Sequence, residues 1–325
     1  MQGKIAVEEH FAIPETSFSR YSGGYWEEIN RRLVDFHDER LARMDEAGIE
    51  IAVLSLNSSA IQGIAEVARA REVARKSNDV LAEAVGKRPD RFAGLAALPM
   101  QDPDAAAREL ARCVRDLGFK GALVNGFSQV GSEDTAIYYD LPQYLPFWAE
   151  VERLGVPFYL HPRDQLMSRR QSYEGHPWLI GSPWGFAEET ALHALRLLGS
   201  GLFDRHPKLQ LVIGHLGERI PFDLWRLDHR LAQVPNRPAK RSMTEYFRSN
   251  VHISTSGNFC TPSLIHTMSV VGADRILFAI DYPFEDNMQG AAWFDGVEIA
   301  EADRSKIGRG NAIELFGLSA RALSL

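Results

Sequence analysis

The sequence predicts an α/β barrel of the TIM type, in which eight parallel strands, each followed by a helix, close on themselves. Short apolar runs recur from one end of the chain to the other, and segments with helical spacing separate them. The length of 325 residues suits one such barrel with long loops, although about 150 residues per domain would also allow two domains. We therefore expect residues 1–325 to form a single domain.

The strands and helices can be placed by their local patterns. Asp102 followed by Pro103 is typical of a helix start, and Thr261 followed by Pro262 opens another helix in the same way. The expected strands cover residues 4–11, 49–56, 92–99, 120–126, 156–162, 208–215, 251–256 and 275–284.

Three connections that follow strands are unusually long and are therefore expected on the C-terminal face of the barrel. They cover residues 12–34, 127–140 and 163–186. Aromatic content favours lids or subunit contacts over disorder, and the aromatic residues are Tyr21, Tyr25, Trp26, Tyr173, Trp178 and Trp184.

Composition excludes several classes of protein. The chain has 36 Lys+Arg against 43 Asp+Glu, a formal charge of −7, which does not favour the basic face that nucleic-acid binding needs. Two cysteines are too few for a disulfide framework. The longest charge-free run, residues 249–273, is too polar to cross a membrane, and the N-terminus lacks the pattern of a signal peptide. We expect a cytoplasmic protein.

Five titratable residues are expected at the mouth of the barrel. Side chains alternate along a strand, so Glu8 and His10 share a face at the end of the first strand. Three more lie at the ends of the fifth, sixth and eighth strands, where barrel active sites gather. These are His161, His215 and Asp281. Imidazoles and carboxylates without thiolates suit Zn²⁺, Mn²⁺ or Fe²⁺, so the set predicts a divalent metal site.

Each of these residues alone has a simpler explanation. A lone histidine at a strand end is more often a hydrogen-bonded structural residue, and an aspartate there is often a helix cap. Glu218, which follows His215 closely, is expected either to orient that imidazole or to act as a favourable charge at a helix N-terminus.

The chain resembles a known family along essentially its whole length. Segments that carry the resemblance are GKIAVEEHFAIPE, RPDRFAGLAALPMQDPDAA, GFKGALVNGFSQ, VPFYLHPR, GLFDRHPKLQLVIGHLGE, DRILFAIDYPFE and KIGRGNAIELFGL. They are similar to the metal-dependent nonoxidative decarboxylases of the amidohydrolase superfamily, and most of all to the γ-resorcylate (2,6-dihydroxybenzoate) decarboxylases. Superfamily hydrolases usually open with His-x-His, whereas this branch opens with Glu-x-His, as at Glu8 and His10.

This resemblance implies a set of roles. Glu8, His10, His161 and Asp281 would bind one divalent metal ion per subunit, Mn²⁺ or Zn²⁺, with no organic cofactor. His215 and Glu218 would lie beside it, His215 also contacting substrate. Arg226 would contact a substrate oxygen, and Phe284 would pack on the substrate ring. The alternatives are that Arg226 forms an ion pair on a helix surface and that Phe284 is an aromatic residue of the core. Relatives form homotetramers.

The implied reaction is reversible removal of CO₂ from an ortho-hydroxybenzoate, most simply 2,6-dihydroxybenzoate giving resorcinol. Asp281 is the expected proton donor to the ring carbon, with His215 and Glu218 as a proton relay. Two alternatives stay open: 2,3-dihydroxybenzoate giving catechol, and a metal-dependent hydrolase of lactones or amides. A non-catalytic metal module is disfavoured because structural zinc sites are typically closed and often cysteine-rich. Because the chain and the substrate are both anionic, attraction has to be local, from the metal, with Arg163 and Arg226 as candidates.

Overall fold

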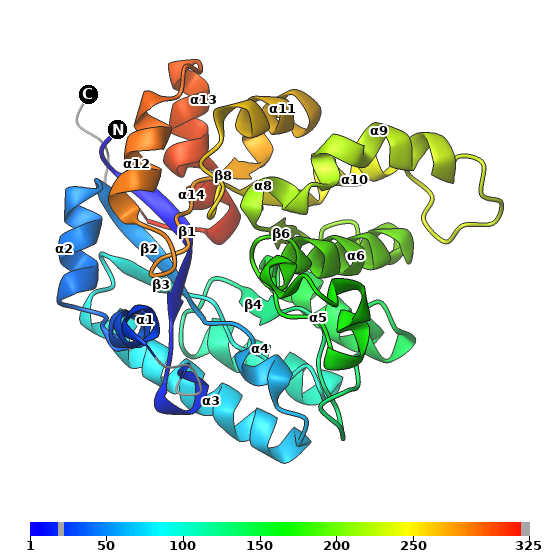
Figure 1. Cartoon of the computed structure of the whole chain (residues 1–325), viewed down its shortest axis with the longest axis horizontal. Coiled ribbons are helices and arrows are strands. Elements are labelled where there is room, and N and C mark those ends of the chain that lie inside the picture. The colour runs from blue at the N-terminus through cyan, green and yellow to red at the C-terminus, as the bar shows by residue number, and fades with distance from the viewer. Residues whose placement is uncertain (19–22, 320–325) are drawn as a thin grey trace.

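The computed structural model describes residues 1–18 and 23–319. Eight parallel strands lie at the centre and helices surround them (Figure 1). All eight expected strands are present, and β3 to β8 are shorter than the apolar runs that predicted them. They are β1 (Lys4–Phe11), β2 (Ile49–Leu56), β3 (Phe92–Gly94), β4 (Ala122–Asn125), β5 (Phe158–His161), β6 (Leu211–Ile213), β7 (Val251–Ser254) and β8 (Ile276–Leu277).

The strands pair into two parallel sheets, and backbone hydrogen bonds from residues in and next to the strands cross both seams between them. Strands β1 to β3 form one parallel sheet and β4 to β8 another. Across the first seam, the Ala96 N–H donates to the Gly121 carbonyl at 2.9 Å. Across the second, the Val7 N–H donates to the Phe278 carbonyl at 3.1 Å, and the Asp281 N–H donates to the Glu8 carbonyl at 3.1 Å. The barrel predicted from the sequence is therefore confirmed.

Helices cover the outside of the barrel. The predicted start at Asp102 is confirmed, because its side chain accepts the Ala105 N–H at 2.9 Å. The second predicted start is also confirmed. The helices are α1 (Gly24–Val34), α2 (Glu39–Glu46), α3 (Val67–Lys87), α4 (Pro103–Arg115), α5 (Leu145–Leu154), α6 (Gly185–Gly199), α7 (Leu202–Arg205), α8 (His215–Glu218), α9 (Ile220–Leu231), α10 (Met243–Ser249), α11 (Thr261–Val271), α12 (Asn287–Gly296), α13 (Glu301–Ser305) and α14 (Asn311–Phe316). Among the described residues, no helix combines the length and the apolar character needed to cross a bilayer.

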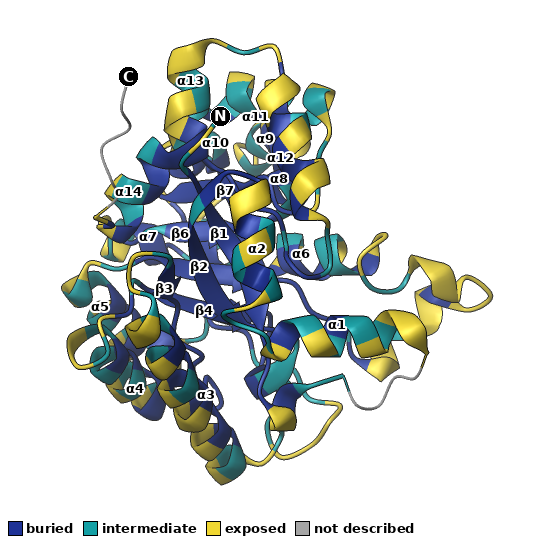
Figure 2. Cartoon of the chain, turned by 90° about the vertical axis from the view of Figure 1, so that its left-hand side faces the viewer, coloured by how far each residue is buried: buried dark blue, intermediate teal, exposed yellow. Residues whose placement is uncertain are grey.

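Two apolar layers hold the barrel together, and Figure 2 shows the buried strands inside helices whose outer faces are exposed. One layer fills the interior of the barrel and includes Ile5, Val7 and Tyr159. The other packs the outside of the strands against the helices and includes Ala6 and Phe11.

A β-bulge interrupts β1 just before the predicted site. Ala6 pairs with Ala52 of β2, but Glu9 pairs with Leu54, so β1 carries one extra residue between these pairs. A bulge of this kind re-aims the side chains that follow it. Val7 therefore faces the barrel interior, and Glu8 and His10 face it as well, while Glu9 points outward.

The long connections contain more structure than the sequence predicted. The 12–34 connection includes α1, and Tyr21 lies outside the described residues. The 163–186 connection contains 3-10 turns at Met167–Tyr173 and Pro177–Leu179. Figure 1 shows α9 extending away from the barrel.

Candidate metal centre and active site

Four of the predicted residues meet at one end of the barrel. One ligand atom from each of Glu8, His10, His161 and Asp281 lies within 4.8 Å of the others. Glu8 and His10 come from β1, His161 ends β5, and Asp281 follows β8 along the chain. Parallel strands bring their carboxyl ends together, which places residues far apart in the sequence at one point.

The two histidines of this cluster present the same ring nitrogen to its centre. His161 Nδ1 lies 2.7 Å from Asn125 Oδ1, and His10 Nδ1 lies 3.2 Å from Ser55 Oγ. Asn125 Oδ1 can only accept, so His161 carries its proton on Nδ1 and its Nε2 lone pair is free. Such outer contacts fix the tautomer and the ring orientation of metal-binding histidines.

Glu8 is fully buried, and its two oxygens have different surroundings. Its Oε2 accepts hydrogen bonds from the hydroxyls of Tyr159 and Ser254, the latter at 2.9 Å. Its Oε1 lies 3.3 Å from His161 Nε2. Tyr159 stays a donor, because burial and then the charge of Glu8 raise its pKa well above the usual value. These two hydroxyls turn the other oxygen of Glu8 toward the centre.

The unsatisfied atoms of the cluster fit a divalent cation. Within the described part of the chain, Glu8 Oε1, His10 Nε2 and Asp281 Oδ1 are buried without a hydrogen-bond partner. Buried polar atoms are normally satisfied, so three of them around one point indicate a ligand. Burial, reinforced by His10, holds the pKa of His161 well below its usual value, which keeps the ring neutral as a metal ligand must be. Two nitrogens and two carboxylates suit Mn²⁺ or Zn²⁺.

His215 and Glu218 lie next to the four-residue cluster, as predicted. His215 Nδ1 lies 2.7 Å from Glu218 Oε1, and its Nε2 lies 3.7 Å from Asp281 Oδ2. Burial opposes a charge on His215, but the carboxylates of Glu218 and Glu8 raise its pKa well above the usual value. Glu218 is 3% exposed and therefore acts on the imidazole and is not a solvated helix charge.

The backbone around this pair is unusual. His215, Glu218 and Asp281 have φ values of 52°, 51° and 85°. Such conformations cost about 1–3 kcal/mol each and persist where the surroundings enforce them, often at active sites. Gly257, at φ 56°, allows the close approach, because a Cβ there would lie 3.2 Å from His215 Cδ2 and 3.5 Å from Asp281 Oδ2.

Asp281 is held in its ionised form. Burial would raise its pKa, but the neighbouring imidazoles of His10 and His215 hold that pKa below the usual range. His10 Nε2 lies 3.1 Å from Asp281 Oδ1. The carboxylate can therefore ligate a cation on one side and exchange a proton with His215 on the other.

Aromatic side chains form a wall beside the cluster. The ring of Phe284 lies 5.8 Å from that of His10 and 5.8 Å from that of Phe18. Phe18 in turn lies 5.1 Å from Trp26 of α1. The 12–34 connection is thus placed next to the site, and Phe284 borders the cluster.

The sequence offers two arginines, Arg163 and Arg226, as candidates for local attraction of an anion. Arg226 is exposed on α9 and makes no hydrogen bond or ion pair with another described residue. Arg163, the other candidate, makes its contacts within the fold. Its guanidinium is buried, donates to the carbonyls of Gln62 and Phe127 at 3.1 and 2.7 Å, and stacks over the Phe127 ring at 4.0 Å.

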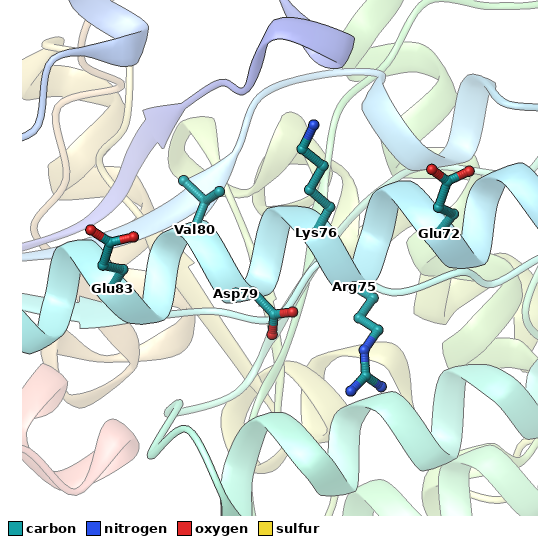
Figure 3. A pocket seen from close by; sticks show the side chains of 6 residues that line it. All are labelled: Glu72, Arg75, Lys76, Asp79, Val80 and Glu83. Carbon is teal, nitrogen blue, oxygen red and sulfur yellow. The ribbon is translucent and has the colours of Figure 1, made fainter.

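A separate concave surface lies along α3 and contains none of the predicted site residues (Figure 3). Most of its charges are paired, for example Asp79 with Arg112 at 2.7 Å and Glu83 with Lys87 at 2.8 Å. It is therefore a solvated helix face. The residues that line it are Glu72, Arg75, Lys76, Asp79, Val80 and Glu83.

Sequence reasoning missed the residues that hold the ligands in place. The available signal was a polar residue in an otherwise apolar strand, as at Asn125 in β4 and Ser254 in β7. Tyr159 stands two residues before His161 and so shares its face, a spacing that the same alternation rule would have identified.

The chain is similar to known proteins along nearly its whole length. The amidohydrolase family model matches residues 10–318. The chain is 58% identical to a gamma-resorcylate decarboxylase of Rhizobium radiobacter, over 99% of this chain and 100% of the relative. It is 59% identical to a gamma-resorcylate decarboxylase of Rhodococcus jostii, over 98% and 99%.

Solved structures with a similar fold and sequence include two dihydroxybenzoate decarboxylases. A 2,6-dihydroxybenzoate decarboxylase complexed with 2,6-dihydroxybenzoate superposes with a TM-score of 0.95 at 59% identity, over 98% of this chain and 100% of that one. A dihydroxybenzoic acid decarboxylase of Polaromonas, with bound manganese and 2-nitroresorcinol, gives 0.94 at 54% identity, over 98% and 97%. With a matching family model over nearly its whole length and a metal-ligand cluster at the mouth of a barrel, the chain belongs to the amidohydrolase family.

Proposed function

We propose that the protein is a metal-dependent nonoxidative decarboxylase that converts 2,6-dihydroxybenzoate reversibly to resorcinol and CO₂. The observation that carries the proposal is the His215–Glu218 pair placed against Asp281 at the edge of the four-residue ligand cluster. The relatives at 54–59% identity have decarboxylase activities in their names, and one structure holds 2,6-dihydroxybenzoate.

The cluster of Glu8, His10, His161 and Asp281 is proposed to hold one divalent ion per subunit. Manganese is favoured over zinc because the Polaromonas structure contains it. When bound, the ion supplies a Lewis acid and a template for the carboxylate and the adjacent phenolate of the substrate. No organic cofactor is needed, because the ortho hydroxyl makes the carboxyl-bearing ring carbon electron-rich.

The chain itself supplies the proton. Asp281 accepts a proton when the anionic substrate enters and displaces water, because a nearby negative charge and desolvation both raise its pKa. It then protonates the carboxyl-bearing carbon, which gives a dearomatised ketone-like intermediate. The bond to the carboxylate breaks, its electron pair restores the aromatic ring, and CO₂ leaves. His215, with Nδ1 on Glu218 and Nε2 toward Asp281, returns a proton from solvent to Asp281.

Phe284 is proposed to pack on the substrate ring, since it borders the His10 imidazole. Arg226 is proposed to contact a substrate oxygen. It is exposed on α9, which directly follows the His215–Glu218 segment along the chain.

We propose a homotetramer, the assembly that the family resemblance implies, and exposed apolar side chains are available to form its interfaces. Phe222 and Trp225 of α9 are 79% and 75% exposed, and Trp178 of the 163–186 connection is 64% exposed. Large exposed apolar side chains grouped on one element usually mark a protein interface. The cytoplasmic location stays a prediction from the sequence.

A substrate panel tests the activity. Mn²⁺-loaded protein is incubated with 2,6-dihydroxybenzoate, 2,3-dihydroxybenzoate, and a set of lactones and amides, and products are separated by chromatography. We expect resorcinol from the first acid and loss of that product after chelation, with recovery on adding Mn²⁺. Catechol as the main product would support the 2,3-isomer. Hydrolysis of lactones or amides with both acids intact would support the hydrolase.

A further inference from the structure

Glu9 is a buried carboxyl group that the proposed reaction does not use. It stands between two ligand residues, is 3% exposed, and points away from the metal cluster into the layer between barrel and helices. Burying a carboxyl group is costly unless it is well hydrogen-bonded, so the contacts of Glu9 deserve an explanation.

The two oxygens of Glu9 hold the backbone on either side of Asp281. Oε1 accepts the N–H of Ile280 at 3.0 Å, and Oε2 accepts the N–H of Tyr282 at 3.3 Å. The N–H of Asp281 itself donates to the carbonyl of Glu8 at 3.1 Å. Three successive N–H groups are therefore anchored to two adjacent residues of β1.

Arg40 of α2 anchors the same strand from outside. Its guanidinium donates to the carbonyl of His10 at 2.6 Å and to the carbonyl of Asp35 at 3.0 Å, and it lies 4.7 Å from the centre of the Tyr282 ring. The His10 N–H donates to the Tyr282 carbonyl at 2.7 Å. Arg40 is 1% exposed, so these contacts are shielded from water.

These contacts explain how Asp281 keeps its left-handed backbone. At φ 85° the residue is in a conformation that needs external support. Glu9 supplies that support on both flanks of the residue, and Arg40 fixes the strand to which Glu9 belongs.

We propose that Glu9 and Arg40 are positioning residues that set the orientation of Asp281, and through it the affinity and geometry of the metal site. This inference rests on the proposed metal site and not on the identity of the substrate. Glu9 touches neither the ligand atoms nor the reacting atoms, and it acts through the backbone of residues 280–282.

The test compares Glu9→Gln with Glu66→Gln in the full chain. A glutamine at position 9 keeps one acceptor oxygen, but its NH₂ group faces a second backbone N–H and leaves it unsatisfied. Glu66 is a matched control, because its two oxygens accept the N–H groups of Ala68 and Arg69 at 2.8 Å each, at the start of α3. Mn²⁺ affinity is measured by chelator competition, and coordination geometry by the visible absorption of Co²⁺-loaded protein.

We expect Glu9→Gln to keep the wild-type circular dichroism, to lose about 10- to 100-fold in Mn²⁺ affinity, and to change the Co²⁺ spectrum. Glu66→Gln should match the wild type in both measurements. A lower melting temperature of Glu9→Gln with unchanged Mn²⁺ affinity and Co²⁺ spectrum would mean a purely structural role and would overturn the proposal.

If Glu9→Gln does not fold, Arg40→Lys provides the test of the positioning role. A lysine ammonium cannot donate to both carbonyls from one planar group, so we again expect weaker Mn²⁺ binding, and wild-type binding would refute the inference. Because these measurements use no substrate, a protein that binds Mn²⁺ but leaves 2,6-dihydroxybenzoate intact would refute the decarboxylase alone.

Discussion

His215 Nε2 lies 3.7 Å from Asp281 Oδ2, close enough for a proton to pass between them after a small movement. On its other side the imidazole is held by Glu218 at 2.7 Å. The side chain of His215 is 24% exposed. Through its contact with Asp281, His215 therefore connects the cluster to solvent.

Asp281→Asn should lower kcat by about 10²- to 10⁴-fold, because an amide cannot deliver a proton to the ring carbon. The isosteric change keeps the backbone contacts, so circular dichroism should be unchanged. Product formation is followed by chromatography with the protein saturated in Mn²⁺. Turnover within twofold of the wild type would remove Asp281 from the role of proton donor.

Tyr159→Phe should weaken Mn²⁺ binding by about 10-fold, the lower end of the range for residues that orient metal ligands. The change removes one of two hydroxyls on Glu8 Oε2 and leaves the aromatic packing of the barrel interior intact. Metal content after dialysis, measured by elemental analysis, checks the effect. Tyr246→Phe, whose hydroxyl contacts Asp204 instead, is the control and should retain wild-type metal.

Phe284→Ala should reduce kcat/KM for 2,6-dihydroxybenzoate by about 2- to 12-fold, which corresponds to about 0.5–1.5 kcal/mol of aromatic packing. Phe284→Tyr keeps a ring and should retain most activity. Steady-state kinetics of the two variants distinguish ring packing from a general loss of the site, and equal losses in both would argue against a ring contact.

His193→Gln should make the protein less sensitive to acid. His193 of α6 is fully buried, and burial lowers its pKa to about 3. Below about pH 6.5 the unfolded chain takes up a proton that the folded chain refuses, so stability falls as the pH drops toward 3. When the pH falls from 7.5 to 5.0, this histidine should lower the free energy of unfolding of the wild type by about 2 kcal/mol.

In the wild type, His193 Nε2 accepts a hydrogen bond from the Tyr139 N–H at 3.3 Å. A glutamine at this position keeps an acceptor for that N–H but does not titrate. Urea unfolding of both proteins at the two pH values gives the comparison. Between pH 7.5 and pH 5.0, the unfolding free energy of the variant should fall less than that of the wild type. If both proteins lose the same unfolding free energy, His193 is not the acid-sensitive group.

Phe222→Asp combined with Trp225→Lys should dissociate the proposed tetramer, because charged side chains on both positions oppose burial in an interface. Light scattering coupled to size-exclusion chromatography measures the mass. Met288→Lys on α12, where the side chain is 42% exposed, should leave the mass unchanged. A wild-type chain that runs as a monomer would exclude the tetramer directly.

Much of the molecule could be predicted from local patterns. Apolar runs located all eight strands, because buried parallel strands need little else than continuous hydrophobicity. The side-chain cluster followed from strand ends, because every parallel strand delivers its last residue to the same face. His161 and Asp281, which are 120 positions apart in the numbering, were placed together on that basis.

The bulge in β1 could not be predicted in this way. Strict alternation would put Val7 and Glu8 on opposite faces, yet both face the interior, because one extra residue in β1 changes the register against β2. The hydrogen-bond partners of Arg163 could not be predicted either. It follows a ligand by two positions, but the carbonyls that bind it come from Gln62 and Phe127, and only the folded chain brings these together.

The sequence by itself therefore determined the barrel, the residue types of the metal site and their arrival at one mouth, since these depend on hydrophobic periodicity and strand direction. Tertiary structure decided which atoms face the centre. Tyr159 and Ser254 turn one oxygen of Glu8 inward, Asn125 selects the nitrogen of His161, and Glu9 flanks Asp281. These contacts join different strands, and hydrogen-bond geometry between distant segments exists only once the chain has closed.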